Sequence, residues 1–350
     1  MRSLPCILLI VSLGLGCQGM SVRTRVAFDS PVDTRVTAEL TPVNPNAGRV
    51  RPINVQLGAG TGRVAIVDVD GLILNTPFVG PLSVGENPVS LFREKLDAIE
   101  ADPCVRGVVL RINSPGGGVA ACMDMRHDLQ RFKARTNLPV VSCLMDTAAG
   151  GAYYLASGGD VVVTGSSTVT GGIGVLLNLF NLQDLMALYN VRPQMIKAGE
   201  MVDIGTSARA LKPEERTLLE TMATDFHQQI KAEILKSRPK LNLDDGRTVD
   251  GRIFTGTQAV NLGLADRIGD LDGAIQLAAQ LGCGQGVDRP QVVLYRRTND
   301  PANSIYSVTA NIPLQGAGLL PNLPGLDRSK LPTFMSVWQP ELTIEKLGGK

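Results

Sequence analysis

Residues Asp146–Ala156 read D-T-A-A-G-G-A-Y-Y-L-A, and an earlier glycine-rich stretch, Arg111–Val119, reads R-I-N-S-P-G-G-G-V. Each stretch joins an apolar, strand-like run to a helix-like pattern. Glycines at such a junction permit positive φ angles and a close approach of another chain. The free N–H groups and the dipole at a helix start favour negative charge there. A tight turn without a ligand is the alternative, but a simple turn needs only one glycine, so the run Gly116–Gly118 favours a binding site.

Strand-like and helix-like segments alternate on both sides of these stretches. We expect strands at Val64–Val69, Val105–Asn113, Leu138–Met145 and Asp160–Thr164. We expect helices at Val89–Asp102, Val119–Thr136, Ala149–Ala156, Val175–Tyr189, Lys212–Ser237 and Asp272–Leu281. This alternation predicts an α/β fold with helices packed around a mainly parallel sheet. The long polar-apolar pattern of Lys212–Ser237 predicts a helical segment that projects from the core.

Composition divides the chain into four expected parts. Residues 1–17 form a leader, and 18–62 form a flexible tether with a short strand at Ile53–Leu57. The main domain covers 63–282, and residues 283–350 form an irregular, proline-rich tail. The formal net charge of +1 gives no sign of a nucleic-acid partner.

The leader combines a positive start at Arg2 with an apolar stretch, Ile7–Leu15, that is too short to span a bilayer. A small residue, Gly16, precedes Cys17, as at a lipoprotein cleavage site. We therefore expect export and lipid attachment at Cys17, which would anchor the protein on the extracytoplasmic face of a membrane. Cleavage of an ordinary secretory signal, giving a periplasmic protein, is the alternative.

The remaining cysteines and the histidines do not predict a metal site or a cofactor. The body of the chain has Cys104, Cys122, Cys143 and Cys283 without a C-x-x-C pair. Buried free thiols are expected, with one disulfide as the alternative in an oxidising compartment. The histidines, at 127 and 227, have no third partner at ligand spacing.

Several motifs in order resemble those of the signal peptide peptidase A (SppA) family, membrane-associated serine peptidases with the ClpP/crotonase fold. The motifs are S-P-G-G-G at Ser114–Gly118, A-A-G-G-A-Y-Y at Ala148–Tyr154, T-G-G-I-G-V at Thr170–Val175, I-K-A-G at Ile196–Gly199 and D-G-R-I-F-T-G-T-Q-A at Asp250–Ala259. The resemblance covers about Arg63–Leu281.

The resemblance implies an endopeptidase that cleaves signal peptides or other membrane-associated peptides. It implies an oxyanion hole formed by the amides of Gly116 and Gly151, and a substrate groove that includes Gly117, Gly118 and Tyr153. It also implies a homo- or hetero-oligomeric ring in which the serine of one protomer meets the lysine of its neighbour.

The chain departs from the family pattern at both chemical groups. The family has A-A-S-G-G-Y-Y, and alignment on the tyrosines puts Gly150 in the place of the nucleophilic serine. The family has I-K-S-G-x-x-K, whereas Ile196–Asp203 reads I-K-A-G-E-M-V-D and puts Val202 in the place of the basic lysine. Lys197 is the only lysine nearby. The hydroxyl groups near the site belong to Thr147, Tyr153, Ser157, Ser166 and Thr170.

Three functions follow from these patterns. The first is a catalytically impaired family member that binds peptides or serves as a scaffold subunit. The second is an active SppA-type endopeptidase with a displaced nucleophile, because the glycine motifs are present. The third, an acyl-CoA enzyme of the crotonase type, fits poorly with an exported chain that has no basic cluster for a CoA phosphate.

Overall fold

The computed structural model describes residues 48–58, 62–77, 86–242, 246–284, 289–298, 300, 302–308 and 334–338, with the backbone of four short strands at 24–29, 33–38, 79–80 and 83–84. The chain divides into two units, Met1–Ala47 and Gly48–Lys350. In the first unit, β1 (Thr24–Asp29) and β2 (Asp33–Ala38) form an antiparallel hairpin. The leader, including Cys17, lies outside the described residues.

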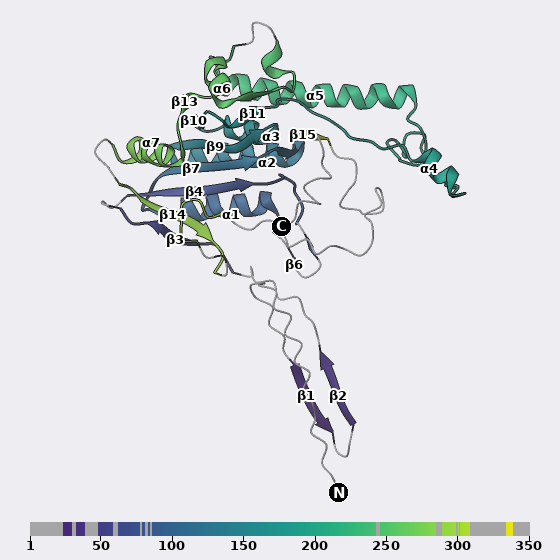
Figure 1. Cartoon of the computed structure of the whole chain (residues 1–350), viewed down its shortest axis with the longest axis horizontal. Helices are drawn as coiled ribbons and strands as arrows, with labels where there is room; N and C mark the ends of the chain where they lie inside the picture. The colour runs from purple at the N-terminus through teal and green to yellow at the C-terminus, as the bar shows by residue number, and fades with distance from the viewer. Residues whose placement is uncertain are drawn as a thin grey trace. The chain divides into compact units, whose positions relative to one another are not determined.

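A mixed, largely parallel sheet forms the centre of the second unit (Figure 1). Its neighbours run in the order β12-β11-β9-β7-β4-β14-β3, and β10 and β13 extend it beside β9. The parallel strands are β4 (Arg63–Asp70), β7 (Val105–Ser114), β9 (Val140–Ala149), β10 (Val161–Thr164), β11 (Val169–Gly171), β13 (Arg267–Ile268) and β14 (Gln291–Arg296). Two antiparallel strands, β3 (Arg51–Gln56) and β12 (Ile253–Thr255), close the ends of this order. The predicted α/β class is confirmed.

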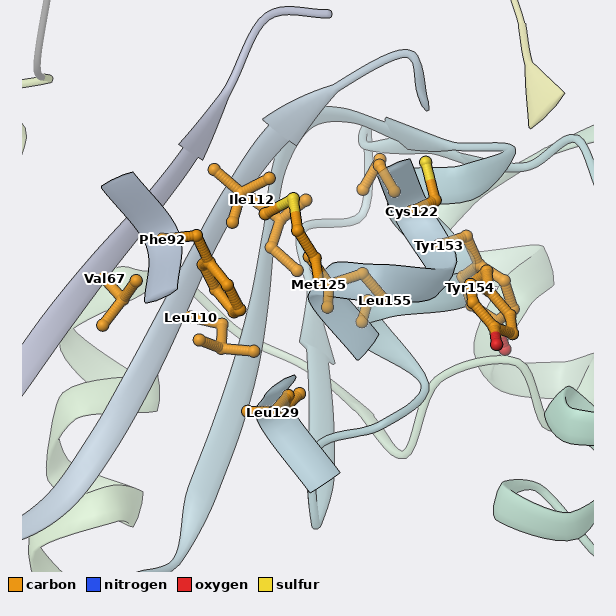
Figure 2. Packing of buried hydrophobic residues seen from close by; sticks show 14 of the residues in the cluster. Val67, Phe92, Leu110, Ile112, Cys122, Met125, Leu129, Tyr153, Tyr154 and Leu155 are labelled. Atoms are coloured by element: carbon orange, nitrogen blue, oxygen red, sulfur yellow. The ribbon is translucent and has the colours of Figure 1, made fainter. Parts of the chain in front are cut away.

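Helices cover both faces of the sheet because its strands are apolar on both sides. On one face, Val67 and Leu110 share a core with Phe92 of α1 (Pro88–Glu100) and Met125 of α2 (Val119–Thr136) (Figure 2). On the other face, the second core includes Ile275 of α7 (Leu271–Cys283). The remaining elements are β5 (Val79–Gly80), β6 (Ser83–Val84), β8 (Gly116–Gly118), α3 (Gly151–Ala156), α4 (Gln183–Leu188), α5 (Pro213–Ser237), a 3₁₀ turn (Arg247–Val249), α6 (Gly256–Leu262) and β15 (Met335–Val337).

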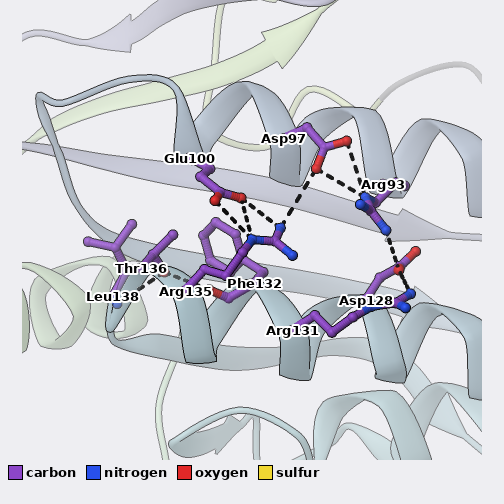
Figure 3. A network of polar contacts seen from close by, with 9 residues as sticks. All are labelled: Arg93, Asp97, Glu100, Asp128, Arg131, Phe132, Arg135, Thr136 and Leu138. Atoms are coloured by element: carbon purple, nitrogen blue, oxygen red, sulfur yellow. Dashed lines mark hydrogen bonds and ion pairs between the residues drawn. The ribbon is translucent and has the colours of Figure 1, made fainter.

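Ion pairs join the outer surfaces of α1 and α2 (Figure 3). Arg135 pairs with Glu100 at 2.6 Å, and Arg93 pairs with Asp128 at 2.8 Å. Three of these side chains are about a third or more exposed, and ion pairs between exposed side chains contribute little to stability. The apolar faces of the two helices therefore set their position on the sheet, and the ion pairs add little to it.

The structure differs from the sequence prediction at one helix and at the ends of the sheet. The helix expected at Val175–Tyr189 is reduced to α4, because the backbone of Leu176 forms a bridge to Met335 and is not helical. The sheet also extends beyond the predicted main domain. β3 precedes this domain in the sequence, β14 follows it, and the two strands pair with each other. Among the described helices, none has both the length and the apolar composition needed to cross a bilayer.

Candidate active site

The two glycine stretches meet because their strands are neighbours in the sheet. β7 leads into β8, and β9 leads through Gly150 into α3, while β7 and β9 pair in parallel. Parallel neighbours end at the same edge of a sheet, where ligand sites of α/β proteins form. A Cβ atom on Gly116 would lie 2.9 Å from the amide nitrogen of Gly151. The structure thus brings together the two residues predicted to form the oxyanion hole.

Gly150 forms a sharp turn between strand and helix. Its φ is +56° and its ψ is −126°, a conformation that residues with a side chain rarely adopt. Its N–H donates to the Gly171 carbonyl at 2.9 Å, and its carbonyl accepts from the Tyr154 N–H at 3.0 Å. In hydrolases a strained strand-to-helix turn of this kind exposes the nucleophile. Here the turn is present and the side chain is a hydrogen atom.

A strand from the C-terminal part of the chain lies against these glycines. β15 pairs antiparallel with β8, with Ser336 opposite Gly117. Two further hydrogen bonds extend this ladder: the Val119 N–H donates to the Phe334 carbonyl at 3.0 Å, and the Trp338 N–H donates to the Pro115 carbonyl at 2.8 Å. The tail that the sequence predicted to be irregular therefore supplies a strand to the predicted groove.

The other edge of β15 is also hydrogen-bonded. Met335 donates to the Leu176 carbonyl at 2.9 Å, and Leu176 donates to the Met335 carbonyl at 2.8 Å. Leu176 directly follows the predicted T-G-G-I-G-V motif. A slot between two backbone edges is the arrangement by which proteins bind an extended peptide as an added strand.

The peptide group between Ser336 and Val337 lies over the turn. Its carbonyl oxygen is 2.5 Å and its carbonyl carbon 2.8 Å from the position that a Cβ atom would take on Gly150. The same oxygen is 3.2 Å from a Cβ position on Gly151 and would overlap one on Gly116. The Ser336 side chain is fully buried. One peptide group of this strand therefore sits among all three glycines that the sequence assigned to catalysis.

Other contacts of the glycine run support the slot. The Gly116 N–H donates to the Ser114 hydroxyl at 3.1 Å. Gly117 faces Ile73, whose carbonyl oxygen would overlap a Cβ atom there. Ile73 donates to the Gly116 carbonyl and accepts from the Gly118 N–H, each at 2.9 Å. Gly117 and Gly118 therefore line the slot that holds β15, and Ile73 supports them from behind.

Tyr153 is a correction to the predicted groove. Its side chain is fully buried in the core, and its hydroxyl donates to the Leu264 carbonyl at 2.8 Å. Burial raises the pKa of this phenol well above its ordinary value. This hydrogen bond helps to fix α3 against the segment before β13. The Tyr153 side chain therefore faces the core and not the groove.

Cys122 is a site residue that the sequence reasoning missed. It lies on α2 in the same core, and its Sγ would overlap a Cβ atom on Gly151. Burial raises the pKa of this thiol to about 12, so it stays protonated at neutral pH and is a weak nucleophile. All four cysteines among the described residues are free thiols.

The predicted base position lies in a different part of the chain. Val202 is 67% exposed in the segment between α4 and α5, and Figure 1 draws α4 beyond the end of α5 that is remote from α3. Lys197 pairs with Asp203 at 2.5 Å, and Asp203 also pairs with Arg209. Hydrogen bonds from Arg209, which has the larger effect, and from Lys197 lower the pKa of Asp203. Lys197 is thus held by a local ion pair.

Two of the hydroxyls that the sequence offered as replacements, those of Ser157 and Thr170, have structural partners. Ser157 donates to the Tyr154 carbonyl and accepts from Arg126 at 2.7 Å. Thr170 donates to the Ala148 carbonyl at 2.6 Å. Within the described ranges, no group of three or more histidine, cysteine or acidic residues is placed to hold a metal ion.

A largely parallel sheet with a glycine-lined slot and a sharp turn at its edge defines an α/β protein of the ClpP/crotonase-like class. The sequence profile of peptidase family S49 matches residues 133–283. The chain is 28% identical over 221 residues to "Putative signal peptide peptidase SppA" of Enterococcus faecium, covering 62% of this chain and 63% of that protein. It is 29% identical over 282 residues to "Serine protease SPPA, chloroplastic" of Arabidopsis thaliana, covering 79% and 40%.

A third relative, "Protease 4" of Salmonella typhi, is 27% identical over 220 residues, covering 63% of this chain and 35% of that protein. The chain spans between 35% and 63% of the length of these three relatives. It belongs to peptidase family S49, among the SppA-type serine peptidases.

Proposed function

We propose that this chain is a non-catalytic member of its family that binds extended peptides, as a peptide-binding or scaffold subunit, at the outer face of a membrane. Gly150 carries the proposal. At the turn where the family resemblance places a nucleophilic serine, the chain has no side-chain oxygen to form an acyl-enzyme. In a serine protease, loss of a triad member lowers turnover by up to ~10⁶.

The base position supports the same proposal. Val202 cannot accept a proton, and Lys197 is held by Asp203. Since the chain offers neither a serine at 150 nor a lysine at 202, it cannot complete a site shared with a neighbouring copy either. The substitutions are far apart in the sequence, so an alignment error at one position leaves the other argument in place.

Residues 180–222, which include α4 and the start of α5, support association with another subunit. Large apolar side chains are exposed along this segment, with Leu188 at 78% and Ile196 fully exposed. The set includes Phe180, Leu185, Leu188, Tyr189, Ile196, Val202 and Met222. Exposed apolar side chains concentrated in one segment mark protein interaction sites. We infer a ring formed with copies of this chain or with active relatives, anchored through the leader at Cys17.

A fluorophosphonate probe tests the absence of a reactive hydroxyl. We expect no labelling of the purified, full-length protein, and none of a Ser336→Arg variant in which the strand is displaced from the slot. A Gly150→Ser variant provides the matched comparison, because it differs only at the turn. Labelling of the native chain at one serine or threonine, lost when that residue is changed, would overturn the proposal.

The second candidate is an active endopeptidase with a displaced nucleophile. The closeness of Gly116 and Gly151 favours it, because paired amides of this kind stabilise an oxyanion by ~3–4 kcal/mol each. Release of amines from casein or a signal-peptide mixture by the purified protein distinguishes the two candidates. Cleavage that persists after removal of contaminating proteases would support the second one.

A further inference from the structure

The slot between β8 and Leu176 is already filled by residues 334–338. Backbone hydrogen bonds hold this segment along both edges, at Val119 and Pro115 on one side and at Leu176 on the other. Side chains add to this backbone pairing. Phe334 contacts Phe226 of α5 edge to face, with ring centroids 5.1 Å apart, and Val337 is buried.

The strand lies where the family resemblance places a substrate. The Ser336 carbonyl oxygen lies near both predicted oxyanion-hole glycines, and its carbonyl carbon faces the place of the missing side chain. The peptide bond between Ser336 and Val337 thus takes the place that a bond to be cleaved would take. With glycine at 150 this arrangement has no nucleophile, and the strand is not exposed to attack.

Because glycine at position 150 has no Cβ atom, it also leaves room for the strand. A Cβ atom there would lie 2.5 Å from the Ser336 oxygen and 3.0 Å from the Val337 nitrogen, and both are backbone atoms that the ladder holds in place. Contacts this short force a shift of one backbone or the other. The residue that removes the nucleophile is therefore also the residue that admits this strand.

We propose that Phe334–Trp338 is a built-in ligand of the groove, and that an extended peptide from another chain binds only after this strand leaves. This inference rests on the proposed peptide-binding function. The fitting partner is an extended segment with a small residue in the position of Ser336, where the side chain is fully buried. A tethered strand competes at a high effective concentration, so it lowers the apparent affinity for every such partner.

Tryptophan fluorescence tests docking directly, because Trp338 is the only tryptophan of the chain. We expect acrylamide to quench it less in the native protein than in the urea-unfolded chain. Gly150→Ala should raise quenching towards the unfolded value. Gly71→Ala is the matched control, because Gly71 has a similar φ of +67° but no atom within 4 Å of its Cβ position. Equal quenching in native and unfolded chains, or in both variants, would overturn the proposal.

Binding of a labelled peptide tests the competition. The probe is a fluorescein-labelled peptide with the sequence of residues 334–338, measured by anisotropy against the full-length protein. Ser336→Arg places a charged side chain in a buried site and should release the strand. We expect this variant to bind the probe at least about tenfold more tightly than the native chain, a difference of about 1.4 kcal/mol.

Ser90→Arg serves as the control for the added charge, because Ser90 is exposed on α1. Circular dichroism confirms that each variant is folded. Equal affinity of the native and Ser336→Arg chains, or no binding by either, contradicts the inference. Failure of the proposed function is a separate result. Labelling of a hydroxyl by the fluorophosphonate probe would disprove that function without changing the fluorescence of Trp338.

Discussion

The guanidinium of Arg126 lies over the ring of Tyr154, with its carbon 4.6 Å from the ring centroid. It also donates to the Tyr154 carbonyl, to Ser157 and to Ser237. One buried side chain of α2 therefore ties α3, which begins at the candidate site, to the far end of α5. Removing its hydrogen bonds would take a charged donor away from three buried or half-buried oxygens.

We predict that Arg126→Met lowers the free energy of unfolding by about 3 kcal/mol, the cost of leaving buried polar groups without partners. Arg131→Met is the control, because Arg131 is 61% exposed and its pair with Asp128 contributes about 0–1 kcal/mol. Urea unfolding followed by circular dichroism measures both. A loss of less than about 1 kcal/mol for Arg126→Met would contradict the assignment of Arg126 as a buried tie.

Cys122 should resist alkylation in the folded protein. Its pKa of about 12 leaves almost no thiolate at about pH 8, and its side chain is fully buried. Cys283 is exposed and serves as the internal control. Peptide mass mapping after treatment with iodoacetamide should find Cys283 modified and Cys122 unmodified until urea is added. Rapid modification of Cys122 in the native protein would instead make it a candidate nucleophile.

The start of α5 should weaken in acid. Arg209, together with the Lys212 N–H, lowers the pKa of Glu215 from 4.5 to about 2. A carboxylate with a depressed pKa stabilises the fold above its ordinary pKa, and this contribution is lost as the pH falls from about 4.5 towards 2.

Glu215→Gln should therefore destabilise the protein at neutral pH and reduce the loss of stability over that acidic interval. Urea midpoints across the pH range measure the effect. Glu214→Gln, at the exposed neighbouring position, should leave the pH profile unchanged. Identical profiles for Glu215→Gln and the native chain would show that the ion pair to Arg209 is not present in solution.

Restoring the family residues should restore peptide cleavage. Gly150→Ser with Val202→Lys supplies the nucleophile and the base, and the Cβ atom at 150 also displaces the chain's own strand from the slot. We expect this double variant to release peptides from casein, with little further change when Ser336→Arg is added. A correctly folded double variant without activity would count against the simple loss of two catalytic groups.

The sequence predicted the helices and strands whose apolar side chains recur at regular spacing. The helix Val119–Thr136 was predicted with the bounds that the structure has, and the strand at Val105–Asn113 differs from β7 by one residue. Both carry apolar side chains at regular spacing, which is the signal that periodicity detects. The closeness of Gly116 and Gly151 was expected from the family resemblance, and the parallel pairing of β7 and β9 accounts for it.

The occupant of the groove could not be predicted in this way. β15 is only three residues long, and its contacts run largely through backbone atoms to glycines, so no side-chain pattern records them. The bridge between Leu176 and Met335 keeps Leu176 out of the helix that the sequence predicted at Val175–Tyr189. Tyr153 was misassigned because adjacent tyrosines on a short helix give no indication of which one faces a groove.

The contact between Phe226 and Phe334 has a mechanical consequence. α5 contacts the strand in the slot through this ring pair at its middle, and it contacts α2 through Arg126 and Ser237 at its C-terminal end. A tilt of α5 therefore alters both attachments together. In the assembly proposed above, a subunit that docks on residues 180–222 would act on the internal strand through this helix.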